Sequence, residues 1–264
     1  MPLTLQDAAA QAEMVRLRPL GPERPWHWLG AGWRDFRRCP GPGLLHGMAA
    51  WLFGAALLTL AGQRFWLLAG AFSGFLLVAP IVATALYAVS RALARGEPID
   101  WALFWRSWRP DKPALMVFGL LLGLAGTGWV LTSASLITAG APSPVNSPMD
   151  FVRVVVLAPE GWLFEAWLLL GAVLAAPVFA SSVLTIPLLL DRRIGLWAAV
   201  LVSWRAVIDQ PVLMAQWAGW LMALTALGMA PLLLGLPVLL PVLAHASWHA
   251  YQDLVDASAL PERG

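Results

Sequence analysis

Long apolar stretches constrain the fold of this chain more than any other feature of its sequence. Six stretches come close to or exceed the roughly 20 apolar residues that a helix needs to cross a bilayer. They span residues 44–62, 65–90, 114–139, 161–190, 212–229 and 231–249. None of them alternates with the period of two that a membrane β-barrel requires. The sequence therefore predicts an all-α, polytopic membrane protein with six transmembrane helices.

The last two predicted spans form one continuous apolar run, and a turn must divide them. Residues 212–249 are about twice as long as a single span needs. Gly228 and Pro231 lie near the middle of this run, and glycine and proline favour turns over a continuous helix. We therefore predict a helical hairpin that turns at residues 228–231.

The distribution of charge predicts the orientation of the protein in the membrane. Only 12% of the 264 residues are charged, against about 25% in a typical soluble domain. Of the 17 lysines and arginines, all but Arg64 and Arg153 fall on the side of the membrane that holds both chain ends. Positive residues are retained on the cytoplasmic side, so both termini are predicted to be cytoplasmic. Residues 1–25 are expected to form a flexible tail, residues 26–255 the membrane domain, and residues 256–264 a second tail.

A pattern of Trp, six residues, Trp and Arg occurs three times and predicts an internal repeat. Its copies are Trp26, Trp33 and Arg34; Trp101, Trp108 and Arg109; and Trp197, Trp204 and Arg205. Each copy precedes a predicted hairpin, and a proline follows it (Pro40, Pro113 and Pro211). The repeats would cover residues 26–100, 101–196 and 197–255. We therefore expect three repeated hairpins, each preceded by an interfacial amphipathic helix.

The paired tryptophans of each copy are expected to anchor a short helix at the membrane surface. Seven residues are two helical turns, so both indole rings lie on one helix face. Such a helix lies flat among the lipid headgroups with its rings toward the hydrocarbon. Recognition of a lipid or of a partner protein by these helices is the alternative interpretation.

Prolines within the even-numbered spans predict kinks. Pro80, Pro177 and Pro237 each lie in an apolar setting, and proline removes one backbone hydrogen bond from a helix. Neighbouring helices or hydroxyl groups can compensate for this loss in a membrane. The alternative is that these positions act as hinges or as a gate.

Few polar side chains in the sequence suggest a catalytic or ligand-binding site. His46, His245 and His249 lie on the predicted cytoplasmic side, and the four-residue spacing of the last two can hold a metal ion or ligate haem iron. Hydrogen bonding at the membrane boundary is the simpler interpretation. The inner-loop aspartates, among them Asp35 and Asp191, are interpreted as salt bridges and helix caps. No catalytic residue and no cofactor is predicted.

Several motifs, in order along the chain, resemble domain-of-unknown-function family 2189, a family of predicted bacterial integral membrane proteins. They are residues 74–80, Leu86-Tyr87, Ser90-Arg91, residues 95–98, residues 180–183, Ile186-Pro187, Leu190-Asp191 and residues 245–251. The resemblance covers roughly residues 28–255. It implies a bacterial inner-membrane protein and implies no activity.

Three functions are compatible with these features. The first is a non-enzymatic scaffold or accessory subunit that contacts the lipid bilayer and another integral membrane protein complex. The second is a channel or permease around a pseudo-threefold axis of the hairpins. The third is a cofactor-binding membrane protein that uses the cytoplasmic-side histidines. Nothing in the sequence predicts binding to nucleic acid.

Overall fold

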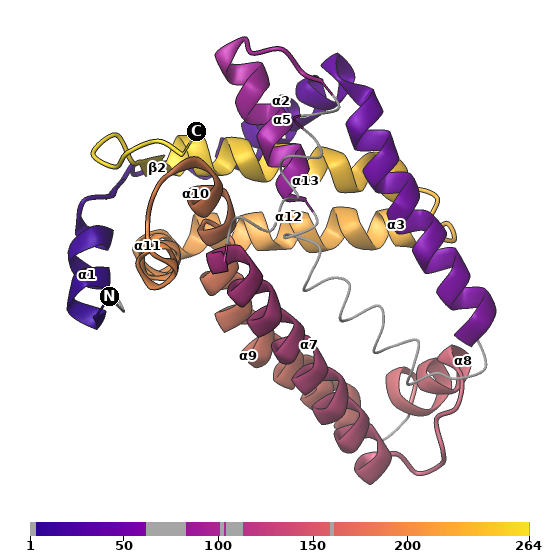
Figure 1. Ribbon diagram of the computed structural model, residues 1–264. Helices are drawn as coiled ribbons and strands as arrows, with labels where there is room; N and C mark the ends of the chain where they lie inside the picture. The colour runs from indigo at the N-terminus through magenta and orange to yellow at the C-terminus, as the bar shows by residue number, and fades with distance from the viewer. Residues whose placement is uncertain (1–3, 62–82, 101–102, 104–112, 159–160, 264) are drawn as a thin grey trace. The chain divides into compact units, whose positions relative to one another are not determined.

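The structure, a computed structural model, is built almost entirely from helices (Figure 1). It describes residues 4–61, 83–100, 103, 113–158 and 161–263. The α-helices are α1 (Leu5–Glu13), α2 (Arg24–Arg38), α3 (Pro40–Ala61), α5 (Thr84–Arg95), α7 (Pro113–Gly140), α8 (Pro148–Phe151), α9 (Leu163–Ser182), α10 (Thr185–Asp191), α11 (Leu196–Asp209), α12 (Pro211–Met229) and α13 (Leu236–Leu254). A short π-helix, η1 (Val152–Val156), follows α8, and two short strands, β1 (Arg16–Leu17) and β2 (Val255–Asp256), form an antiparallel pair.

Four helical stretches in the described part of the chain are long and apolar enough to cross a membrane. They are Pro40–Thr59, Pro113–Gly140, Leu163–Asp191 and Pro211–Met229. They coincide with the predicted spans 44–62, 114–139, 161–190 and 212–229. Residues 65–82 of the predicted span 65–90 lie outside the described residues. The predicted span 231–249 corresponds to the turn before α13 and to most of α13, which is not among the four.

Three of the long apolar helices begin at a proline: α3 at Pro40, α7 at Pro113 and α12 at Pro211. Proline is favoured in the first helical turn, because the backbone N–H that it lacks has no partner there. These are the prolines that follow the Trp-x6-Trp-Arg copies. Pro40 therefore lies at the boundary between α2 and α3, and Pro211 lies at the boundary between α11 and α12.

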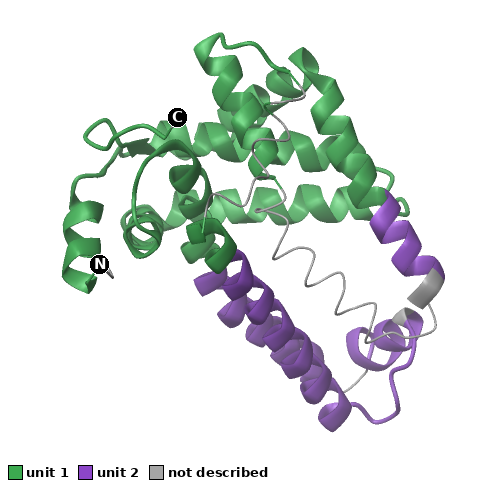
Figure 2. Ribbon diagram, in the orientation of Figure 1, with its two compact units in different colours: residues 1–51, 80–118, 179–264 green, residues 52–79, 119–178 purple. Residues whose placement is uncertain are grey.

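The chain divides into two compact units (Figure 2). Unit 1 comprises residues 1–51, 80–118 and 179–264, and unit 2 comprises residues 52–79 and 119–178. In unit 1, α13 is the central helix, and α2, α5, α10 and α12 all pack against it. Trp248 and Tyr251 of α13 are buried in this core.

The turn between α12 and α13 occupies residues 230–235, which overlaps the predicted turn at residues 228–231 and extends four residues beyond it. The Gly235 amide donates to the Gly228 carbonyl oxygen at 3.0 Å. A Cβ on Gly235 would lie 2.6 Å from the Gly228 Cα, so only glycine lets the two helix ends approach this closely. Leu232 and Leu233 adopt left-handed backbone conformations within the turn.

Both chain ends are part of unit 1. Helix α1 packs against α11 and buries Ala8 and Ala12. Arg16 and Leu17 of β1 pair with Asp256 and Val255 of β2. The flexible tail expected at residues 1–25 therefore contains a docked helix and a paired strand. The apolar face of α1 provides the reason, since it can be buried only against another element.

Unit 2 contains most of α7 and α9, which lie side by side. The Trp167 indole N–H donates to the Ser133 hydroxyl oxygen at 2.7 Å, and Trp129 packs against Gly171. A small apolar cluster (Ile137, Val145, Val155 and Leu163) closes the connection between the two helices. The segment between the predicted spans 114–139 and 161–190, which is predicted to be the outer loop, is partly helical, with α8 and η1 inside it.

Candidate functional site

Helix α2 has one face buried in unit 1 and one face exposed. Trp28, Asp35 and Phe36 are buried. Gly32 sets how closely α2 approaches α13, because a Cβ at this position would lie 2.6 Å from the Val242 carbonyl oxygen and from the Ala246 amide nitrogen. At the start of α2, the Trp28 indole N–H donates to the Asp253 carboxylate at 2.8 Å, and Arg24 forms an ion pair with the same oxygen. The exposed face of α2 carries two tryptophans and three arginines, which are Trp26, Trp33, Arg34, Arg37 and Arg38.

A buried network of polar side chains joins α2 to α5 and α13. The Oδ2 atom of Asp35 accepts the Ser90 hydroxyl at 2.8 Å and lies 2.8 Å from Nε2 of His249. The Ser90 hydroxyl oxygen also lies 2.7 Å from Nδ1 of His245. Ser90 and His245 are fully buried, and Asp35 is 5% exposed. The network therefore connects three helices through one carboxylate.

The hydrogen-bond geometry assigns a tautomer to His245. An ionised Asp35 only accepts, so both the Ser90 hydroxyl and the His249 Nε2–H donate to it. Ser90 has a single hydrogen, which leaves Nδ1–H of His245 as the donor to the Ser90 oxygen. Nε2 of His245 then keeps its lone pair, and no group in the described part of the chain hydrogen-bonds to it.

The ionised state of Asp35 follows from its partners. Burial raises the pKa of this carboxyl, but the hydrogen bonds from His249 and Ser90, with the nearby histidine charges, lower it by more. The pKa of Asp35 therefore lies below its ordinary value. A carboxylate that accepts two hydrogen bonds remains charged at neutral pH.

The structure places the three histidines predicted as metal or haem ligands near one another, and both His245 and His249 form hydrogen bonds with other side chains. His249 uses Nε2 to reach Asp35, and His245 uses Nδ1 to reach Ser90. His46 is buried as well. Among the described residues, no group of three or more His, Cys, Asp or Glu side chains has the geometry of a metal site. The sequence interpretation missed Ser90 as a member of this network. It predicted a salt bridge or a helix cap for Asp35, and Asp35 pairs with His249.

A second polar cluster fastens the C-terminal segment to α5 and α10. Asp191 accepts the Tyr251 hydroxyl at 2.8 Å and the Arg192 Nε–H at 3.0 Å. Arg95 lies 3.5 Å from Asp191 and forms a closer ion pair with Glu262 at 2.8 Å. Salt bridges were predicted for Asp191, and the structure contains them.

The two polar clusters gather motifs that are distant in the sequence. The motif residues found in them are Ser90, Arg95, Asp191, His245, His249 and Tyr251. All of these belong to the motifs by which the chain resembles family 2189. The packing of α13 against α5 and α10 brings these motifs together.

Two copies of the tryptophan repeat lie on helices in the described part of the chain. Trp26 and Trp33 of α2 are 62% and 44% exposed, and Trp197 and Trp204 of α11 are 53% and 37% exposed. Both pairs therefore face outward, as their spacing predicts. Arg34 is exposed, whereas Arg205 donates to the Ala12 carbonyl oxygen of α1 at 3.0 Å. The middle copy (Trp101, Trp108 and Arg109) lies outside the described residues.

The predicted proline kinks fall in different settings. Pro177 is inside α9, as expected for a kink. Pro237 lies in the first turn of α13, where a proline fits without breaking a helical hydrogen bond. The proline inside α13 is Pro241, which the sequence interpretation did not single out. Pro80 lies outside the described residues.

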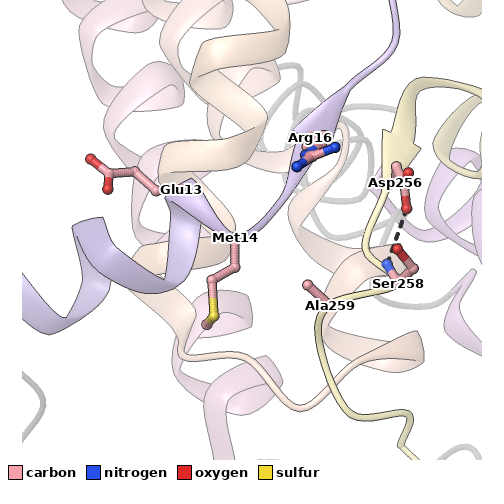
Figure 3. A pocket seen from close by; sticks show the side chains of 6 residues that line it. All are labelled: Glu13, Met14, Arg16, Asp256, Ser258 and Ala259. Atoms are coloured by element: carbon pink, nitrogen blue, oxygen red, sulfur yellow. Dashed lines mark hydrogen bonds between the residues drawn. The ribbon is translucent and has the colours of Figure 1, made fainter.

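Two surface pockets have linings that contain no histidine. One, of about 420 Å³, lies where β1 and β2 pair (Figure 3) and is lined by Glu13, Met14, Arg16, Asp256, Ser258 and Ala259. Within it, Asp256 accepts the Ser258 amide at 3.1 Å, and Glu13 points away from the other labelled residues. The other, of about 330 Å³, is lined by residues between 137 and 146. Neither pocket is lined by a residue of the Asp35 network.

Comparison with known proteins supports the membrane assignment. Residues 67–191 match the model of a family described as predicted integral membrane protein (DUF2189). No curated protein matches the chain, and no solved structure matches it.

Proposed function

We propose that this chain, whose residues 67–191 match the DUF2189 family of predicted integral membrane proteins, serves as a non-enzymatic scaffold or accessory subunit of a larger membrane complex. Its membrane part would consist of six spans arranged as three hairpins. Both termini would lie on the cytoplasmic side of a bacterial inner membrane. The interfacial helices α2 and α11 would anchor it and present faces to a partner.

The exposed stripe of α11 carries this proposal. Trp197, Leu201, Trp204 and Ile208 are all exposed, at spacings of four, three and four residues. These spacings place them on one face of the helix. The opposite face, with Ala198, Ala199, Val202 and Ala206, is fully buried. Large aromatic side chains are enriched where proteins bind one another, so the outward stripe suits an apolar partner surface at the edge of the bilayer.

The engagement of the polar groups favours a scaffold over a reactive site. Asp35 and His249 bond to each other, and Asp191 and Tyr251 do the same. These bonds hold α2, α5, α10 and α13 in a fixed arrangement. A rigid body of this kind presents an interaction surface without the ordering cost that a flexible segment would incur on binding.

The six-span topology is supported by two further observations. Helices α12 and α13 pack against each other and are joined by a six-residue turn. Short connections of this kind join antiparallel helices. The charge distribution, with only Arg64 and Arg153 on the outer side, agrees with an even number of crossings.

Site-specific photocrosslinking tests the scaffold function. A photoreactive amino acid at Leu201, in the exposed stripe of α11, should crosslink the chain to a defined membrane protein in native membranes. The same probe at Ser258, which is exposed in the C-terminal segment, serves as the control. Recovery of only lipid adducts at Leu201, together with a free monomer in mild detergent, would refute the proposal.

A further inference from the structure

The exposed face of α2 combines indole rings with unpaired positive charge. Trp26, Trp33 and Arg37 are spaced by seven and four residues, so they lie on one helix face. Arg34 and Arg38 lie beside them, and all five side chains are exposed. We propose that this face is a binding surface for the headgroups of anionic phospholipids. The inference rests on the proposed interfacial position of α2 and is independent of any protein partner.

The arginines of this face have no ion-pair partner among the described residues. No carboxylate of the described residues forms an ion pair with Arg34, Arg37 or Arg38. Asp35, the acidic residue within α2, points inward to Ser90 and His249. Three guanidinium groups therefore face outward with no acidic residue of α2 to neutralise them.

The position of these charges fits the depth of lipid phosphates. Arg37 and Arg38 end α2, and the apolar stretch of α3 begins at Pro40, two residues later. A guanidinium group at this boundary reaches the phosphate layer and binds a phosphate through two parallel hydrogen bonds. Trp26 and Trp33 would fix the helix at the same depth, because indole rings favour the membrane–water interface.

Comparison with α11 shows that the repeat alone does not create this surface. Both helices contain the Trp-x6-Trp-Arg pattern, but Arg205 is bound to the Ala12 carbonyl oxygen. The outward stripe of α11 is apolar, and Asp209 at its end is exposed. Anionic lipid should therefore bind at α2 and not at α11.

Native mass spectrometry of the full-length protein in mild detergent tests the proposal. Phosphatidylglycerol and phosphatidylcholine are titrated separately, and the lipid retained by the protein is counted. The wild type should bind phosphatidylglycerol at least tenfold more tightly, since each arginine near an anionic surface contributes about fivefold. The variant R34Q/R37Q/R38Q should lose this preference. The control R16Q/R153Q/R193Q, which removes the same charge from exposed arginines elsewhere, should keep it.

Three other outcomes would each overturn the inference. Equal binding of the two lipids by the wild type would show that α2 does not select anionic headgroups. Equal loss in both triple variants would show a general effect of net charge. Displacement of phosphatidylglycerol by millimolar inorganic phosphate would show a site for free anions in place of a lipid surface. Circular dichroism and thermal unfolding of each variant confirm that the exposed substitutions leave the protein folded. A failed crosslink at Leu201 would reject the scaffold function and leave these lipid measurements unaffected.

Discussion

Nε2 of His249 lies 2.8 Å from Oδ2 of Asp35, although 214 residues separate them in the sequence. The carboxylate is almost fully buried, whereas the imidazole is about a quarter exposed. The same oxygen accepts the hydroxyl of Ser90. This contact fixes α2, with its outward tryptophans and arginines, to the central helix α13. The buried network therefore determines how the exposed face of α2 is presented.

Replacement of Asp35 by asparagine should destabilise the protein. The amide carries no charge, and a hydrogen bond to a charged group contributes about 1.5–3 kcal/mol. We expect the midpoint of thermal unfolding to fall by about 3–10 °C in detergent. The matched control is Asp209→Asn, at an exposed position at the end of α11. This substitution should change the midpoint of thermal unfolding by about 1 °C or less. Equal midpoints for Asp35→Asn and the wild type would show that the network does not stabilise the fold.

The stabilising effect of Asp35 should depend on pH. Its pKa in the folded protein lies below the ordinary value of 3.8. Burial raises this pKa, but the hydrogen bonds from His249 and Ser90 and the electrostatic effect of the nearby histidines together lower it by more. A lowered pKa stabilises the fold at pH values above 3.8, and this contribution disappears as the pH falls through the folded pKa. The difference in unfolding temperature between wild type and Asp35→Asn should therefore persist from pH 7 to 5 and shrink below pH 4.

Other carboxylates do not obscure this measurement. The pKa values of Asp7, Asp150 and Asp256 are also lowered, by hydrogen bonds to neighbouring groups. Both proteins retain these three residues, so their effect cancels in the difference. A difference that stayed constant down to pH 3 would show that Asp35 does not titrate as the hydrogen-bond geometry requires.

Gly32 and Gly30 should respond in opposite ways to substitution by alanine. A Cβ at Gly32 would meet backbone atoms of α13 at 2.6 Å, whereas a Cβ at Gly30 meets nothing within 4 Å. Gly32→Ala must therefore push α2 away from α13 and should lower the unfolding temperature by several degrees. Gly30→Ala should leave it unchanged or raise it, because alanine favours a helix by about 1 kcal/mol over glycine. Similar effects of the two substitutions, measured by thermal unfolding, would argue against this close helix packing.

Apolar length was sufficient to predict α3, α7, α9 and α12. A membrane span needs only a long helix of apolar side chains, and no particular pairing of residues. The tryptophan spacing likewise implies that both tryptophans of α2, and both of α11, share one helix face, because helical periodicity is a local property. Their role as membrane anchors stays a prediction. The predictions for residues 65–82 and for the middle tryptophan copy remain predictions, because these segments lie outside the described residues.

The polar network could not be predicted in the same way. Asp35 stands among arginines in the sequence, where an aspartate ordinarily forms a surface salt bridge. Its burial depends on how α2 packs along α13, and Gly32 was the only local sign of that contact. The sequence interpretation expected a flexible tail at residues 1–25 and missed the N-terminal helix, although Thr4 and Asp7, which form a capping box at its start, are a local signal for it.

Arg205 should be needed for docking of α1, in addition to any contact with the membrane. Its guanidinium group donates to the Ala12 carbonyl oxygen, and the Gln11 side chain accepts the Gly195 amide nearby. Arg205→Gln should release α1 and increase proteolysis within residues 5–20 in limited digestion. The control Arg193→Gln removes an exposed arginine just before α11 and should leave the digestion pattern unchanged. Equal protection of the N-terminal segment in both variants would show that the arginine does not hold α1.

The turn between α12 and α13 should be accessible from the outer side of the membrane. In a Cys39→Ala background, which removes the sole cysteine, single cysteines are placed at Leu234 in this turn, at Asn146 in the predicted outer loop and at Ser258 near the C-terminus. All three positions are exposed. Applied to spheroplasts of a bacterial expression host, an impermeant maleimide should label Leu234→Cys and Asn146→Cys, and should reach Ser258→Cys only after permeabilisation.

Because Asn146 and Ser258 mark the two sides, labelling of Leu234→Cys only after permeabilisation would place the turn with the C-terminus. The hairpin of α12 and α13 would then fail to cross the bilayer, and the six-span topology would be wrong.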